Sequence, residues 1–147
     1  MLQKVLLFIA VLVVFLVIFD AIFHNNPSKM DVVLGGKTFI MDIADTPALQ
    51  EQGLSGRTQL ADNAGMIFIF STPDEYGFWM KDMNFPLDII WLSPDKHVVF
   101  MEKSLTPQTY PTIYYPTSPA SYVLEISAGE ADALNLKIGD TVNFTKK

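Results

Sequence analysis

Apolar residues form one long uninterrupted run near the N-terminus and several short runs further along the chain. Residues 5–19 are all apolar, and after Asp20 the run resumes with residues 21–23. A helix over residues 5–23 would be roughly 28 Å long at about 1.5 Å per residue, close to the thickness of the hydrocarbon core of a bilayer. The pattern therefore predicts a transmembrane helix within residues 1–23, which form an N-terminal signal anchor.

The same run is also compatible with a cleaved secretory signal peptide. Cleavage after Ala21 would place Phe19 at a position where signal peptidase prefers a small residue, so an uncleaved anchor is favoured. Lys4 and the terminal amine precede the run and Lys29 follows it, which favours a cytoplasmic N-terminus and an extracytoplasmic domain. If the segment is cleaved, the same domain is secreted.

Short apolar and alternating runs in the rest of the chain predict β-strands. Residues 24–29 have turn composition and predict a tether, and residues 30–147 predict one β-rich domain. The strands are expected at residues 31–34, 37–43, 66–70, 76–80, 87–92, 97–102, 122–127 and 141–144. Gly35-Gly36 and residues 93–96 have the composition of tight turns, so each predicts a hairpin.

Two short helices complete the predicted fold. Thr46 and Pro47 are suited to begin a helix over residues 48–52, and Gly53 is suited to end it. A second helix is expected at residues 130–136. This order of elements predicts an α+β, mainly β fold: an antiparallel sheet in a barrel-like or sandwich arrangement with two short helices, preceded by one transmembrane helix.

Charge and cysteine content narrow the classes of function. The 147 residues include 10 Lys or Arg and 16 Asp or Glu, so the formal net charge is −6. This charge repels phosphate backbones, and the only basic cluster is the terminal Lys146-Lys147, so no nucleic-acid partner is expected. There is no cysteine, which excludes disulfides, thiolate metal sites and lipid attachment through cysteine. The hydrophobic core is therefore expected to be stabilised by side-chain packing, without disulfide or thiolate–metal cross-links.

The usual catalytic and metal-binding motifs are missing from the sequence. His24 and His97 are the only histidines, and neither has the neighbours of a catalytic triad or a zinc site. There is no nucleophile elbow and no glycine-rich phosphate loop. The sequence therefore predicts no catalytic residue, no metal and no cofactor.

The most distinctive polar residues lie in residues 78–91, where two apolar runs flank a short polar turn. Trp79 stands beside Lys81 and Asp82, so that an amphipathic ring is flanked by groups able to orient a ligand. Asp88 interrupts an apolar run, where burial costs several kcal/mol unless the carboxylate is paired.

Arg57 is the only arginine and is the expected partner of a buried carboxylate, either Asp88 or Glu125. Two interpretations remain: an ion pair that fixes the fold, or a polar pocket that uses these groups on a ligand. Glu125 shares a strand face with Val123 and Ser127. If that face is solvated, Glu125 needs no explanation. If that face points into the mouth of a barrel, Glu125 could form a carboxylate pair with Asp82 or Asp88 that acts in general acid–base catalysis.

Several of these motifs together resemble the family known as domain of unknown function 192. The matching residues are Glu51, Gly53-Leu54, Arg57, Leu60, residues 65–70, residues 78–90, Leu124-Glu125-Ile126, Ala128-Gly129 and Gly139-Asp140. The resemblance implies a small mixed fold dominated by β structure, often behind a signal or anchor segment. It implies no biochemical role.

The sequence as a whole predicts a membrane-anchored extracytoplasmic domain that binds a small ligand, an envelope polymer or a partner protein. The residues expected to bind are Arg57, Trp79, Lys81, Asp82, Asp88 and Glu125. Binding is preferred to catalysis. One alternative is a carboxylate-dependent hydrolase or lyase that acts on envelope polysaccharide. Another is a purely structural or assembly module, which would have an exposed apolar patch and no pocket.

Overall fold

A computed structural model describes residue 13 and residues 27–145 of the chain. The predicted membrane anchor in residues 1–23 therefore lies outside the described residues, except for residue 13, as does the first half of the predicted tether. In the part of the chain that is described, no helix combines the length and the apolar character needed to cross a bilayer.

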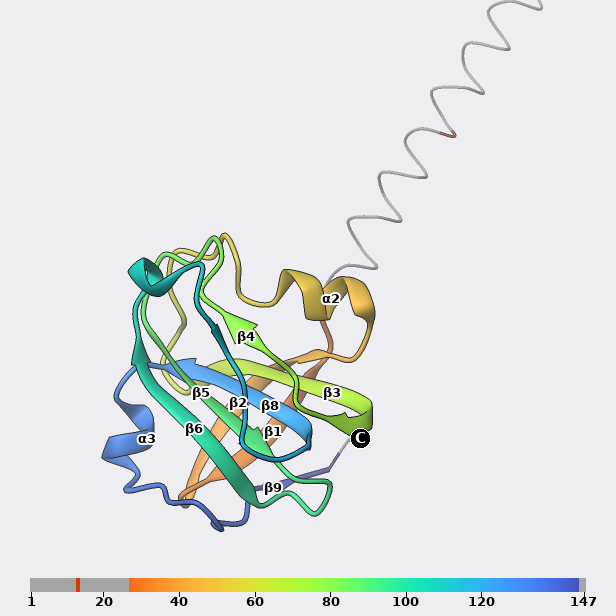
Figure 1. Cartoon of the computed structure of the whole chain (residues 1–147), viewed down its shortest axis with the longest axis vertical. Helices are drawn as coiled ribbons and strands as arrows, with labels where there is room; N and C mark the ends of the chain where they lie inside the picture. The colour runs from red at the N-terminus through yellow and green to blue at the C-terminus, as the bar shows by residue number, and fades with distance from the viewer. Residues whose placement is uncertain (1–12, 14–26, 146–147) are drawn as a thin grey trace, which may run out of the picture.

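The domain is built on one curled seven-stranded sheet (Figure 1). Its strands are β1 (Lys29–Leu34), β2 (Lys37–Ala44), β3 (Ala64–Asp74), β5 (Leu87–Leu92), β6 (Val98–Leu105), β8 (Ala120–Ser127) and β9 (Asn143–Phe144). They lie in the order β6-β5-β8-β3-β2-β1-β9. A second, two-stranded sheet pairs β4 (Phe78–Trp79) with β7 (Ile113–Tyr114). The prediction of a mainly β, barrel-like fold is confirmed.

Two short helices lie on opposite sides of the curled sheet, α2 (Pro47–Gln52) beside β4 and α3 (Glu130–Ala133) on the far side (Figure 1). A 3₁₀ turn, η1 (Pro107–Thr109), precedes β7. Helix α2 forms as the sequence predicts. Thr46 Oγ1 accepts a hydrogen bond from Leu49 N at 3.4 Å, Pro47 is the first helical residue, and Gly53 follows the last turn with a φ of 51°.

One strand pair departs from the antiparallel prediction, because β2 and β3 run parallel. The chain leaves β2, passes through α2 and re-enters the sheet in the same direction as β3, and a helix is the usual way to connect parallel strands. The connection holds α2 over one end of the sheet.

Several predicted ends shift by a few residues. The predicted strand 76–80 shortens to β4, and the predicted strand 97–102 becomes β6, with His97 left as an isolated bridge to Thr141. The predicted helix 130–136 ends earlier, because Asn135 adopts the left-handed conformation with a φ of 52°.

Both faces of the sheet are buried, so the domain has two apolar clusters. Side chains of one face of β1, β2, β3, β5 and β8 pack with α3 and β9. Side chains of the other face pack beneath the segments that surround α2 and β4, and the central members of this cluster are Met66, Phe68, Leu87, Ile89, Trp91 and Val123. The second face carries the candidate site.

Candidate functional site

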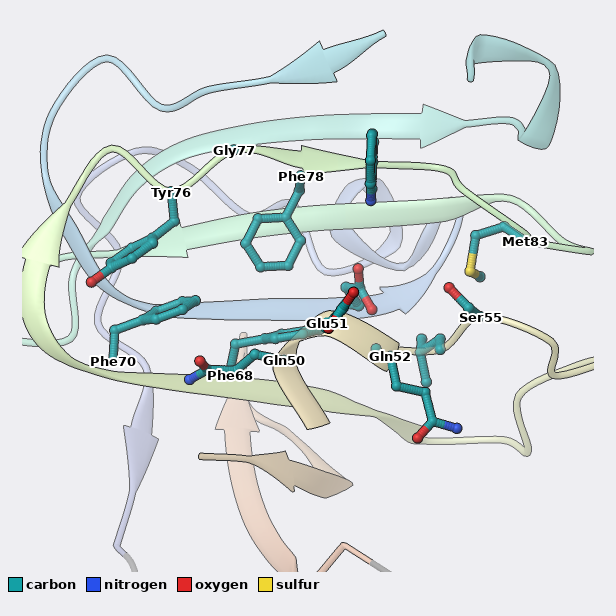
Figure 2. A pocket seen from close by; sticks show the side chains of 14 residues that line it. Gln50, Glu51, Gln52, Ser55, Phe68, Phe70, Tyr76, Gly77, Phe78 and Met83 are labelled. Carbon is teal, nitrogen blue, oxygen red and sulfur yellow. The ribbon is translucent and has the colours of Figure 1, made fainter. Parts of the chain in front are cut away.

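A cleft of about 280 Å³ opens on this second face, between α2 and β4 (Figure 2). Its lining comes from α2 and the loop after it, from β3, from the segment that contains β4, and from β8. The lining residues are Gln50, Glu51, Gln52, Gly53, Leu54, Ser55, Phe68, Phe70, Tyr76, Gly77, Phe78, Trp79, Met83 and Glu125. The cleft is therefore assembled from four parts of the chain that are distant in sequence.

Aromatic rings form most of the wall of the cleft. Phe68 and Phe78 meet edge to face with ring centroids 4.7 Å apart, and Phe70 stacks on Tyr76 at 3.6 Å. Figure 2 shows the stacked pair at one end of the cleft and Met83 at the other, with Phe78 pointing from β4 toward Phe68. The rings offer a ligand a large apolar surface in a fixed arrangement.

Glu125 is the buried carboxyl group that lines the cleft. Its side chain is 5% exposed, and within residues 27–145 its Oε2 is the only buried side-chain oxygen or nitrogen without a hydrogen-bond partner. Burial raises the pKa of Glu125 to about 8, and the positive charge of Arg57 opposes part of this effect. The carboxyl group is therefore mostly protonated at neutral pH.

Gly53 brings the backbone after α2 close to this carboxyl group. A Cβ atom at position 53 would lie 3.4 Å from the Phe68 ring and 3.8 Å from Glu125 Oε2. The φ of 51° also favours glycine here. A side chain at this position would narrow the cleft directly in front of Glu125.

Arg57 does not pair with Asp88, so that prediction is wrong. Arg57 Nη2 lies 2.8 Å from Asp42 Oδ2, and Lys29 is a more distant second partner of Asp42 at 3.8 Å. Asp42 and Glu125 both flank Met66 in the register of the sheet, on the same face. The Arg57 charge thus affects the pKa of Glu125, while Arg57 itself forms its ion pair with Asp42.

Asp88 lies on the opposite face of the sheet from Glu125, so the predicted convergence of these two carboxyl groups is also wrong. Asp88 Oδ1 accepts a hydrogen bond from Ser104 N at 2.8 Å, and Oδ2 accepts one from Ala131 N at 2.9 Å. Its side chain is 0% exposed and does not line the cleft. These contacts tie β5 to β6 and to the first turn of α3.

Lys81 and Asp82 are exposed and do not line the cleft, so Asp82 is not the partner of Glu125 either. The polar turn at residues 81–84 that contains them is instead joined to the loop after α2. Three hydrogen bonds make this connection: Ser55 Oγ to Lys81 O at 2.9 Å, Gly56 N to Asp82 O at 2.9 Å, and Asn84 Nδ2 to Arg57 O at 2.8 Å. The turn therefore positions Met83 and the α2 loop at the edge of the site.

Trp79 is the other predicted residue that lines the cleft, and its side chain is 43% exposed. Lys81 Nζ lies 5.6 Å from the centroid of the Trp79 ring, and Tyr110 lies 5.7 Å from it, centroid to centroid. The structure thus brings together Trp79 and Glu125 from the predicted set. That these residues bind a ligand stays a prediction.

The phenylalanine and tyrosine wall and Glu51, which also lines the cleft, were not among the predicted site residues. Phe68 and Phe70 read as ordinary strand residues, because an apolar residue in a buried strand looks the same whether it faces a core or a cleft. Glu51 carried a signal, since it belongs to the family motif that precedes Gly53-Leu54. Among residue 13 and residues 27–145, no group of three or more His, Cys, Asp or Glu is placed to hold a metal ion.

The fold and the site together define a class of protein: a small, mainly β domain in which a buried carboxyl group lies under an aromatic cleft. The family model described as DUF192, Uncharacterized ACR, matches residues 30–144, so the chain belongs to this family. This confirms the resemblance found in the sequence. The comparison with curated proteins gave no match.

Two solved structures are similar to this chain. A Sinorhizobium meliloti 1021 protein, described as a candidate transcription regulator, shares 29% identity with a TM-score of 0.75, over 81% of this chain and 95% of that chain. A Novosphingobium aromaticivorans protein of unknown function shares 34% identity with a TM-score of 0.70, over 80% of this chain and 84% of that chain. Both similarities support the fold and leave the biochemical role unassigned.

Proposed function

We propose that this domain is a binding module whose site is the aromatic cleft, and that Glu125 is the polar group that recognises the ligand. One observation supports this most strongly: Glu125 Oε2 is buried and has no partner among the described residues. Leaving a buried polar atom unsatisfied costs about 1 to 3 kcal/mol. A ligand that forms the missing hydrogen bond would offset this cost.

The shape of the cleft supports a small ligand or one unit of a larger one. Its volume of about 280 Å³ is close to the lower end of the range for small-molecule pockets, which begins at roughly 300 Å³. The rings supply apolar contact area and Glu125 supplies a buried polar group. Gln50 and Gln52 also line the cleft, where Gln50 Nε2 already donates to Ala44 O and Ile69 O. An apolar wall with few polar groups is the usual composition of a binding pocket.

A second candidate function is acid catalysis, as in a hydrolase or lyase that acts on envelope polysaccharide. The observation that favours it is the raised pKa of Glu125, because a general acid must hold its proton at the working pH. Glu51, at the rim of the same cleft, would be the second carboxyl group. Release of sugar fragments from envelope polysaccharide, lost in Glu125→Gln, would favour this function over binding.

We propose that the domain works on the extracytoplasmic side of a membrane, anchored by residues 5–23. The apolar run and the charges around it support this placement. Cell fractionation tests it: the full-length chain should stay in the membrane fraction, and a shortened soluble form would contradict it. The net charge of −6 supports a partner other than nucleic acid.

The binding function is tested by screening the full chain, solubilised in detergent, against small neutral, cationic and anionic compounds that include envelope sugars and amines. Ligand-observed NMR should detect at least one compound that binds wild type and competes for one site. Glu125→Leu should lose that binding, whereas Glu102→Gln, which removes a carboxylate on β6 outside the cleft, should keep it. Binding that is equal in both variants, or no binding at all, would contradict the proposal.

A further inference from the structure

We propose that the ligand of this cleft is a protonated amine with apolar substituents, bound with its N–H group directed at Glu125. This inference rests on the proposed binding function and names the chemical class of the ligand. Three features of the cleft support it: the charges of its lining, the aromatic wall, and the direction of the missing hydrogen bond.

The lining favours a cation over an anion. Glu51 and Glu125 both line the cleft, and no Lys, Arg or His is among its lining residues. A phosphate or carboxylate ligand would therefore meet two carboxyl groups and no basic side chain in the lining, while the charge of Arg57 reaches Glu125 from outside it. An ammonium group would meet two acidic partners.

The aromatic wall favours a cation that carries apolar groups. The faces of Trp, Tyr and Phe rings attract ammonium groups, and several rings around one site strengthen this effect. Trp79 already has such a contact, with Lys81 Nζ 5.6 Å from its ring centroid. The remaining rings form two contacting pairs, Phe68 with Phe78 and Phe70 with Tyr76, and all four line the same cleft as Glu125.

In its ionised form Glu125 is acceptor-only, so the missing hydrogen bond to Oε2 then requires a donor, which a protonated primary or secondary amine has. The charge of Arg57 acts on Glu125, but the ion pair of Arg57 is with Asp42. Glu125 Oε2 is thus left for a group that arrives with the ligand. A quaternary ammonium ion has the charge and lacks the donor, so it should bind more weakly.

Binding of an amine should be linked to the release of a proton. The charged groups around Glu125 are Arg57, whose charge acts on it, and Asp42, which lies in the same row of the sheet. Glu51 lines the same cleft from α2, and the neighbours of Glu125 on β3 and β5 are uncharged. Because the pKa of Glu125 is raised to about 8, the carboxylate that pairs with an ammonium group is a minor form at neutral pH. Affinity should therefore rise with pH up to about 8, by up to about tenfold per pH unit, and level off above it.

The test uses cyclohexylammonium as probe, with cyclohexanol as its uncharged analogue and cyclohexanecarboxylate as its anionic analogue. Calorimetry on the full chain in detergent should give about tenfold tighter binding of the ammonium probe than of cyclohexanol at pH 8, and no binding of the carboxylate. The affinity for the ammonium probe should increase from pH 6 to pH 8 in wild type. In Glu125→Gln the binding should weaken about tenfold and lose its pH dependence, while Glu102→Gln should behave as wild type.

The wild-type pH profile keeps the test decisive if Glu125→Gln does not fold. Equal binding of cyclohexanol, stronger binding of the carboxylate, or a flat pH profile would each overturn the amine assignment while the proposed binding function still stands. Absence of binding by all three probes would also overturn it. The separate compound screen then decides whether the cleft binds any ligand.

Discussion

Asp88 and Glu125 are two buried carboxyl groups on adjacent strands, and they differ in how completely the protein satisfies them. Both oxygens of Asp88 accept hydrogen bonds from backbone N–H groups, at 2.8 and 2.9 Å. Glu125 Oε2 has no partner within residues 27–145. Each oxygen of Asp88 thus has a hydrogen-bond partner within the described domain, whereas one oxygen of Glu125 has none there.

The difference follows from the side of the sheet on which each carboxyl group lies. Asp88 is opposite Ile126 on β8, whereas Glu125 is opposite Ile89 on β5, so the two side chains point to opposite faces. One face meets the N–H groups of Ser104 and Ala131, which are not needed for the sheet ladder. The other face meets aromatic rings. Burial alone therefore does not mark a functional carboxyl group; burial without partners is the informative observation.

The largest effect is expected from removing the satisfied carboxylate. Asp88→Ala should lower the free energy of unfolding by about 3 to 5 kcal/mol, because two backbone N–H groups lose a charged acceptor. Urea denaturation measures it, and Asp95→Ala, in an exposed turn, should change stability by less than about 0.5 kcal/mol. A loss below about 1 kcal/mol for Asp88→Ala would remove the contrast between the two carboxyl groups.

The unsatisfied carboxyl group should instead make stability depend on pH. The ordinary pKa of 4.5 applies to Glu125 in the unfolded chain, and the folded chain has a pKa of about 8. Between these values the unfolded chain holds fewer protons, so the free energy of unfolding should fall by up to about 1.4 kcal/mol for each pH unit of increase. Above pH 8 this contribution should be constant.

Urea denaturation from about pH 5 to about pH 9 checks this, with Glu125→Leu as the comparison. The leucine variant should lack the slope and should be more stable than wild type at pH 8, because it removes a buried polar group without a partner. Equal slopes in the two proteins would show that Glu125 gains a partner or solvent in solution.

A smaller effect is expected from Arg57→Gln. The Arg57 side chain is 35% exposed and its ion pair with Asp42 is screened, so its loss should cost about 1 kcal/mol of stability. The pKa of Glu125 should rise further, since the opposing positive charge is gone. Carbon-13 NMR titration of the Glu125 carboxyl group measures this shift. Arg57→Lys keeps the charge and should leave the pKa closer to that of wild type.

Local elements were predicted well because their signals are local. Gly35 and Gly36 both adopt positive φ in the turn between β1 and β2, and Lys96 N donates to Ser93 O in the predicted turn before β6. The two predicted hairpins formed, but the pairing of strands that no tight turn connects was not predicted, because alternation shows which residues share a face and not which strand lies beside them. The parallel pairing of β2 with β3 is the clearest example.

The candidate site was predicted in part for a related reason. Trp79 and Glu125 were expected in one site, and both line the cleft. Asp88 was misplaced because every residue of β5 is buried, so its sequence shows no alternation between a core face and a solvent face. Asp42 carried the same signal as Asp88, a carboxylate within an apolar strand, and it is the actual partner of Arg57.

Strand β8 gives the domain a particular order of assembly. It lies between β5 and β3, although it follows both in the chain, so the sheet exists as two separate parts until β8 enters. Each part has an exposed strand edge until then, and pairings between distant segments form slowly. Glu125 is on β8, so the strand that joins the two parts also supplies the buried carboxyl group of the cleft. A partly synthesised chain that lacks β8 therefore lacks Glu125, so the proposed binding site cannot form before β8 joins the sheet.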